Sequence, residues 1–177
     1  MFKYIIPFLL LFIVGCATKK PDIDYDPAFQ INTLSAFSVV YNAEQSYDTL
    51  NDERIREAIV NEMELKGYLG TAKERADFHI DFKSSIKEDV PSNVGVGFGV
   101  GTFTRSMGFS MSTANQIIFT DEETILINMI DPNTKKTFWS TSITQDKKDF
   151  KSPQERTDYY NEIVTIMLKE FPPRLVD

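Results

Sequence analysis

The fold is decided by a stretch near the C-terminus that reads Thr124-Ile-Leu-Ile-Asn-Met-Ile130, Asp131-Pro-Asn-Thr134 and then Thr137-Phe-Trp-Ser-Thr-Ser-Ile-Thr144. The first segment is apolar on both faces, which is typical of a central strand. The middle segment consists of turn-forming residues. The last segment places Trp139, Thr141 and Ile143 on one face, the alternation of a half-buried strand. We therefore predict an antiparallel strand pair over residues 124–144.

Two more strands are predicted upstream of this pair. Apolar side chains recur at every second position near Leu34 to Asn42 and again from Ala76 to Lys87. This period is that of a β-strand with one buried face.

Two helices complete the pattern. The first is predicted from Asn51 to Lys66, with Asn51 as its N-cap and Gly67 as a left-handed terminator. The second opens at Ser152, where a capping box coincides with a proline at the first helical position. Its apolar stripe has helical spacing and consists of Tyr160, Ile163, Val164, Met167, Leu168 and Phe171. We predict an α+β fold, an antiparallel sheet of about four to five strands with both helices packed on one face.

The N-terminus has the layout of a secretory signal peptide. Lys3 precedes an apolar run, and the run ends at Gly15 and Cys16, the only cysteine of the chain. The ending Ile-Val-Gly-Cys16 resembles the lipobox of bacterial lipoproteins, which implies cleavage after Gly15 and acylation of Cys16. A membrane-spanning helix would need about 20 apolar residues, roughly twice the run present here.

The predicted anchor divides the chain into three parts. Residues 1–15 are the signal peptide, residues 16–27 the lipidated cysteine and a polar tether, and residues 28–177 a single domain. The tether spans at most about 35 Å, so the domain stays close to the membrane. Ala17 occupies the position where an Asp would retain a lipoprotein in the inner membrane, which favours the outer membrane and a periplasm-facing domain.

The charge of the chain argues against nucleic acid as a partner. The formal net charge is -7, and removal of Lys3 with the signal peptide makes it -8. Nucleic-acid binding depends on lysine and arginine neutralising phosphates. Because acylation uses the one cysteine, no disulfide is expected and packing alone must hold the domain.

A glycine-rich segment covers residues 94–112. It begins Val94-Gly-Val-Gly-Phe-Gly-Val-Gly101 and matches neither phosphate-binding glycine motif. We expect a loop or an edge hairpin, since glycine weakens strands. Partner contact is predicted here at four apolar residues, Phe98, Phe103, Met107 and Phe109. Insertion into a membrane would require a closed oligomer, because a lone hairpin leaves its backbone groups unpaired in lipid.

Residues typical of catalysis or metal binding are scarce. His79 is the only histidine, and its place on the polar side of a predicted strand favours a solvated position. The acidic run at residues 121–123 lacks the turn glycine of a calcium loop, so a solvated strand entry is expected. We predict no catalytic residue, no metal and no cofactor.

Several loose motifs in a fixed order resemble the bacterial lipoprotein family called domain of unknown function 4136. They are Tyr25-Asp26-Pro27, Asp52 to Ile59 continuing to Lys66-Gly67-Tyr68, Ala76-Asp77-Phe78, Ile125 to Asp131, Thr134 to Trp139, and Phe171-Pro-Pro173. Asn128 stands where an Asp is expected in that family. The resemblance implies an envelope lipoprotein with an α+β domain, and it implies no activity.

The sequence thus predicts a lipid-anchored, non-enzymatic module that binds a protein or another component of the bacterial envelope. One alternative is a self-assembling or membrane-contacting protein that uses residues 94–112. A second is a hydrolase, which would need a deep pocket holding His79 and two acidic groups with shifted pKa values.

Overall fold

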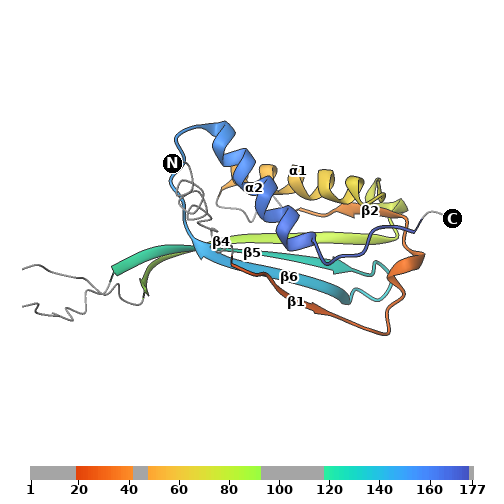
Figure 1. Ribbon diagram of the computed structural model, residues 1–177. Helices are drawn as coiled ribbons and strands as arrows, with labels where there is room; N and C mark the ends of the chain where they lie inside the picture. Colours follow the sequence, from red (N-terminus) through yellow and green to blue (C-terminus); the bar gives the residue numbers. More distant parts are fainter. Residues whose placement is uncertain (1–18, 42–47, 93–117, 176–177) are drawn as a thin grey trace, which may run out of the picture.

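The computed structural model describes residues 19–41, 48–92 and 118–175. These residues form two α-helices and a six-stranded sheet with the order β1-β6-β5-β4-β2-β3 (Figure 1). The strands are β1 (Asp22–Tyr25), β2 (Ala36–Val39), β3 (Leu69–Gly70), β4 (Phe78–Ser92), β5 (Ile118–Ile130) and β6 (Thr137–Asp146). The helices are α1 (Thr49–Leu65) and α2 (Pro153–Leu168), with short 3-10 turns η2 (Ile31–Thr33) and η4 (Lys73–Arg75).

The predicted α+β class is confirmed, but two details of the predicted sheet are wrong. The sheet has six strands rather than four to five, because the edge strands β1 and β3 contain only four and two residues. It is mixed rather than antiparallel, because β2 runs parallel to both β3 and β4. A parallel pair requires a crossover connection, and α1 lies in the segment between β2 and β4.

Part of the predicted tether belongs to the sheet. β1 pairs antiparallel with β6 in the register Asp22↔Ser142 to Tyr25↔Trp139. The alternation of four residues is too short to distinguish a strand from a polar linker, which is why the sequence did not reveal it.

The predicted strand pair over residues 124–144 is confirmed as β5 and β6. Its register places Met129 opposite Trp139 and Ile125 opposite Ile143, and all four side chains are buried. The Asp131 carboxylate accepts hydrogen bonds from the Asn133 N–H and the Thr134 hydroxyl, both at 2.8 Å. These bonds hold the turn that joins the two strands.

The α1 helix starts earlier than predicted. Its N-cap is Asp48, whose side chain accepts from the Asn51 N–H at 3.2 Å, so Asn51 lies inside the helix instead of capping it. The predicted terminator is confirmed, since Gly67 has φ +89°. The Tyr68 N–H then donates to the Met63 carbonyl, which satisfies an acceptor at the helix end.

The α2 helix starts as predicted. The Ser152 hydroxyl caps it by accepting from the Glu155 N–H at 3.1 Å, and Pro153 is the first helical residue. All six residues of the predicted apolar stripe are buried.

An aromatic cluster joins the sheet to the segment after α2. Phe171 lies 5.2 Å from the Trp139 ring and 5.6 Å from the Tyr68 ring, measured between centroids. Both helices lie on the same side of the sheet in Figure 1. The core therefore sits between that side of the sheet and the helices, and Trp139, which is only 3% exposed, is part of it.

The two longest strands extend beyond the rest of the sheet. β6 pairs with β5 only as far as Asp146 opposite Glu122. Past this point β4 and β5 continue together to Ser92 opposite Ile118, after a bulge between Lys87 and Val90. We call residues 88–92 and 118–121 the β4–β5 ribbon; Figure 1 shows it projecting from one end of the domain.

Candidate functional site: an open pocket and a buried carboxyl group

The site residues predicted from the sequence lie outside the described residues. This holds for Gly15 and Cys16 and for the four predicted contact residues Phe98, Phe103, Met107 and Phe109. Their roles stay predictions. Within the described ranges no helix is both long and apolar enough to span a bilayer.

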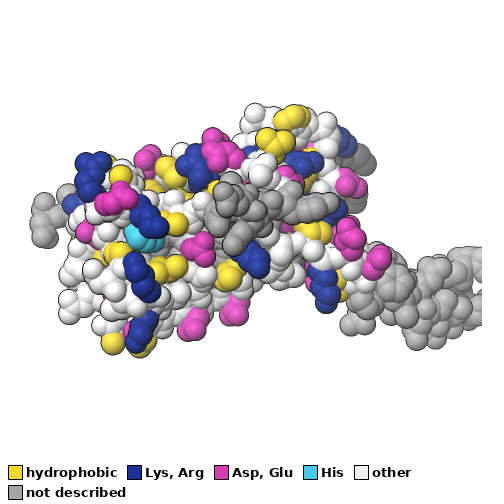
Figure 2. All heavy atoms as spheres, turned by 180° about the vertical axis from the view of Figure 1, so that it is seen from behind, with side chains coloured by type: hydrophobic (Ala, Val, Ile, Leu, Met, Phe, Trp, Pro, Cys, Tyr) yellow, Lys and Arg dark blue, Asp and Glu magenta, His cyan; other side chains and the backbone are white. Residues whose placement is uncertain are grey.

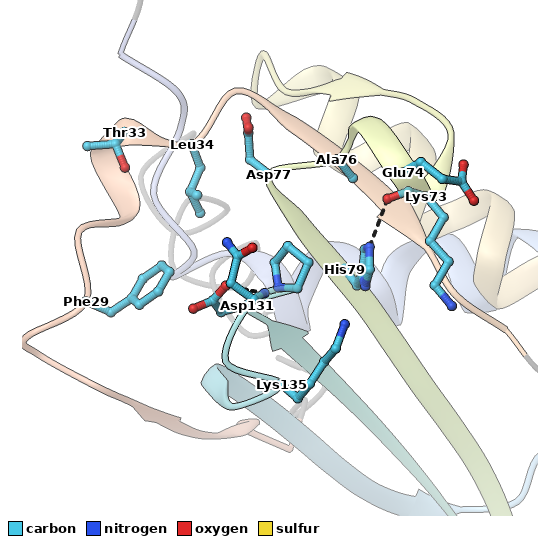
Figure 3. Close-up of a pocket in the computed structure, with 12 residues that line it drawn as sticks. Phe29, Thr33, Leu34, Lys73, Glu74, Ala76, Asp77, His79, Asp131 and Lys135 are labelled. Atoms are coloured by element: carbon cyan, nitrogen blue, oxygen red, sulfur yellow. Dashed lines mark hydrogen bonds between the residues drawn. The ribbon is translucent and has the colours of Figure 1, made fainter.

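A pocket of about 720 Å³ lies at the end of the domain opposite the β4–β5 ribbon. Three segments that are distant in sequence form it: the connection from Phe29 to Leu34, the segment from Lys73 to His79, and the turn between β5 and β6 (Figure 3). The sequence did not reveal this pocket, because only the folded sheet brings these segments together.

The histidine predicted to be solvated is buried instead. His79 is 8% exposed, and its Nε2 atom lies 3.1 Å from the Lys73 carbonyl oxygen. A carbonyl can only accept, so Nε2 carries the proton. The η4 turn covers the strand at this point, a tertiary contact that strand periodicity does not report.

Lysine side chains flank His79. In Figure 3 the side chain of Lys135 extends from the turn between β5 and β6 toward His79, and the side chain of Lys73 lies to one side of the ring. Figure 2 shows the single histidine between Lys or Arg side chains on this face of the molecule. Asp77, Glu74 and Asp131 also line the pocket, so it presents charges of both signs.

Two aspartates that line the pocket, Asp77 and Asp131, accept hydrogen bonds from nearby groups of the domain. One Asp77 oxygen accepts from the backbone N–H groups of Ser35 and Ala36, each at 2.9 Å. The hydrogen bonds in the turn lower the pKa of Asp131, the Asn133 N–H first among them. A general base that works near neutral pH usually needs a raised carboxyl pKa. The lowered pKa of Asp131 departs from this requirement, and both aspartates already accept hydrogen bonds within the domain.

The acidic run predicted to be solvated contains a buried residue. Glu123 is 4% exposed and points to the side of the sheet covered by α2, where it accepts from the Tyr160 hydroxyl at 2.8 Å. Ser84 donates to the same oxygen at 3.4 Å. Burial raises the pKa of the Glu123 carboxyl, and these two hydrogen bonds offset only part of the rise.

This carboxyl group also affects its tyrosine partner. Burial and the nearby Glu123 carboxylate raise the pKa of the Tyr160 hydroxyl above its usual range. The Tyr160 hydroxyl therefore keeps its proton, which it needs in order to donate to the Glu123 carboxylate. Among the described residues, no group of three or more His, Cys, Asp and Glu side chains is placed to hold a metal ion.

Comparison with protein families identifies the class of the chain. Residues 21–173 match the model of the family described as "Domain of unknown function (DUF4136)", so the chain belongs to this family. The match begins at the residue before β1 and ends just after Phe171. A search of curated proteins found no match.

Solved structures are similar to the chain at low sequence identity. A PDZ domain protein from Parabacteroides distasonis has a TM-score of 0.53 and 12% identity over 88% of this chain, which spans only 36% of that protein. A PelC dodecamer from Paraburkholderia phytofirmans has a TM-score of 0.50 and 11% identity, covering 88% of this chain and 98% of that one. A minor lipoprotein from Acinetobacter baumannii is more distant, with a TM-score of 0.42, 5% identity, and coverage of 78% and 93%.

Proposed function

We propose that the chain is a lipid-anchored lipoprotein of the bacterial envelope. In this proposal the chain is cleaved after Gly15, and acyl groups on Cys16 hold it in the outer membrane with the domain facing the periplasm. Several acyl chains together hold a protein firmly, whereas one binds only marginally.

The position of β1 is the observation that carries this proposal. Asp22 is already paired with Ser142 in the sheet. Only residues 17–21 separate it from Cys16, and five residues span at most about 18 Å. A lipobox cysteine so close to a folded edge strand suits a domain that works at the membrane surface.

The domain itself binds rather than catalyses in this proposal. The pocket beside His79 supports it, because charges of both signs surround an open space while Asp77 and Asp131 are held by backbone groups. Such a surface fits a charged segment of a protein or another polar component of the envelope.

Self-assembly through residues 94–112 is the second candidate. Two observations favour it: the β4–β5 ribbon leads directly into this segment, and one relative of the same fold is a dodecamer. Loss of concentration-dependent oligomers on deletion of residues 94–112 would support this candidate. The hydrolase alternative requires two acidic groups with shifted pKa values beside His79; of the acidic residues that line the pocket with this histidine, Asp131 has a lowered pKa.

In-cell photocrosslinking tests the binding proposal. A photoreactive amino acid at Lys136, beside the pocket, is compared with one at Glu57, exposed on α1. We expect a discrete crosslinked product from position 136 and none from position 57. Replacement of Lys73 and Lys135 by Glu should then remove the product. Equal crosslinking at both positions, or a product that survives these replacements, would contradict a role for the pocket.

A further inference from the structure

The direction of β1 shows from which end the chain enters the domain. Because β1 runs antiparallel to β6, residues before Asp22 lead toward the C-terminal end of β6. An ion pair agrees with this path, since the Lys19 ammonium lies 3.6 Å from an Asp146 carboxylate oxygen. Both side chains of this pair are largely exposed, so the pair indicates where Lys19 lies but contributes little to stability.

The same end of the domain carries the β4–β5 ribbon. Asp146 is the last residue of β6 and pairs with Glu122 of β5. β5 extends four residues beyond Glu122, as far as Ile118, and pairs with β4 over this length of about 14 Å. An ion pair between Lys147 and Asp121, at 3.2 Å, links the chain after β6 to the base of the ribbon.

The distance that the chain can span between Lys19 and Cys16 is comparable with the length of the ribbon. Three residue steps separate Lys19 from Cys16, which allows about 10 Å at most. An acyl group on Cys16 would therefore lie close to the end of the domain from which the ribbon projects. The opposite end is far away, because the thirteen residues of β5 extend over about 40 Å from Ile118 to the turn that follows Ile130.

We infer that the end of the domain bearing the β4–β5 ribbon faces the bilayer, that the ribbon contacts the phospholipid surface holding the anchor, and that the pocket beside His79 points away from it. This inference rests on the proposed acylation of Cys16. It assigns the two ends different partners: a lipid surface at the ribbon and a polar component of the periplasm at the pocket.

Fluorescence quenching in vesicles tests this orientation. The only native cysteine is consumed by acylation, so one introduced cysteine can carry a dye in the acylated full-length product. We would compare Glu88→Cys on the ribbon, Lys136→Cys beside the pocket, and Glu57→Cys on α1, all at exposed positions. The proteins are reconstituted in phosphatidylethanolamine–phosphatidylglycerol vesicles that contain a lipid with a spin-labelled headgroup.

We expect the dye at position 88 to lose most of its fluorescence and the dye at position 136 to lose none, with position 57 between them. Equal quenching at positions 88 and 136, or stronger quenching at 136, in protein that floats with the vesicles would overturn the inferred orientation alone. Protein that fails to float with the vesicles would overturn the acyl anchor, and the orientation with it. Thermal unfolding of each variant checks that the domain is intact.

Discussion

The buried pair Glu123–Tyr160 allows a stability prediction that depends on pH. Replacing Tyr160 by Phe removes the hydroxyl that donates to Glu123 at 2.8 Å and leaves the 3.4 Å contact from Ser84. Loss of this donor should cost about 1 kcal/mol while the carboxyl group is protonated and up to about 3 kcal/mol once it is ionised. The cost should therefore be larger at pH 8 than at pH 5.

The matched variant is Glu123→Gln, whose amide oxygen can still accept from Tyr160 but carries no charge. Burial raises the folded-state pKa of Glu123 above 4.5, so the folded state keeps a proton that the unfolded state releases. Its contribution to stability is thus full below pH 4.5 and declines as the pH rises toward the folded-state pKa. Glu123→Gln should be free of this decline and gain stability relative to the wild type as the pH rises.

Urea unfolding of the domain without residues 1–15, followed by fluorescence of the single tryptophan, measures both effects. Asp52 and Asp81 also have raised pKa values, so the difference between variant and wild type isolates Glu123. A Tyr160→Phe cost below about 0.5 kcal/mol at pH 8 would refute the reasoning, because that is the range of surface substitutions. Parallel pH profiles of Glu123→Gln and the wild type would refute it as well.

Three other substitutions test the fold by urea unfolding followed with circular dichroism. Trp139→Ala should cost about 3–5 kcal/mol, since the ring is buried against Phe171; a negligible loss would mean that it is an exposed contact residue. Asp48→Ala should cost about 1 kcal/mol by removing the N-cap of α1, and an unchanged midpoint would contradict that cap. Gly67→Ala should cost about 1–2 kcal/mol because its φ of +89° disfavours a side chain; equal stability would show that the turn relaxes.

Much of the fold is readable from local patterns. The strand pair around Asp131 is visible as alternating apolar residues on either side of a turn. The α2 helix is visible as an apolar stripe that follows a capping serine and a proline. Both signals lie within about twenty consecutive residues, where period and capping chemistry are strongest.

The remaining features depend on contacts between distant segments. β1 and β3 are too short to show a period, and the parallel placement of β2 depends on how α1 crosses the sheet. The burial of His79 and of Glu123 has the same origin, since η4 covers one and Tyr160 of α2 covers the other. Polar residues at strand positions predict solvent contact only while nothing packs above them.

The same distinction between local patterns and contacts of distant segments applies to the candidate functional residues. The pocket is formed by three separate segments, so no local sequence motif predicts it. Cys16 is the opposite case, because the resemblance to a lipobox is carried by a few consecutive residues and needs no knowledge of the fold.

The central claim is that Cys16 is the acylated first residue of the mature protein. Mass spectrometry of the N-terminal tryptic peptide, taken from protein extracted from the membrane fraction with detergent, tests it most directly. We predict a peptide that starts at Cys16 and carries a thioether-linked diacylglyceryl group and an amide-linked acyl chain. A peptide that retains residues before Cys16, or one in which this cysteine is a free thiol, would contradict the claim.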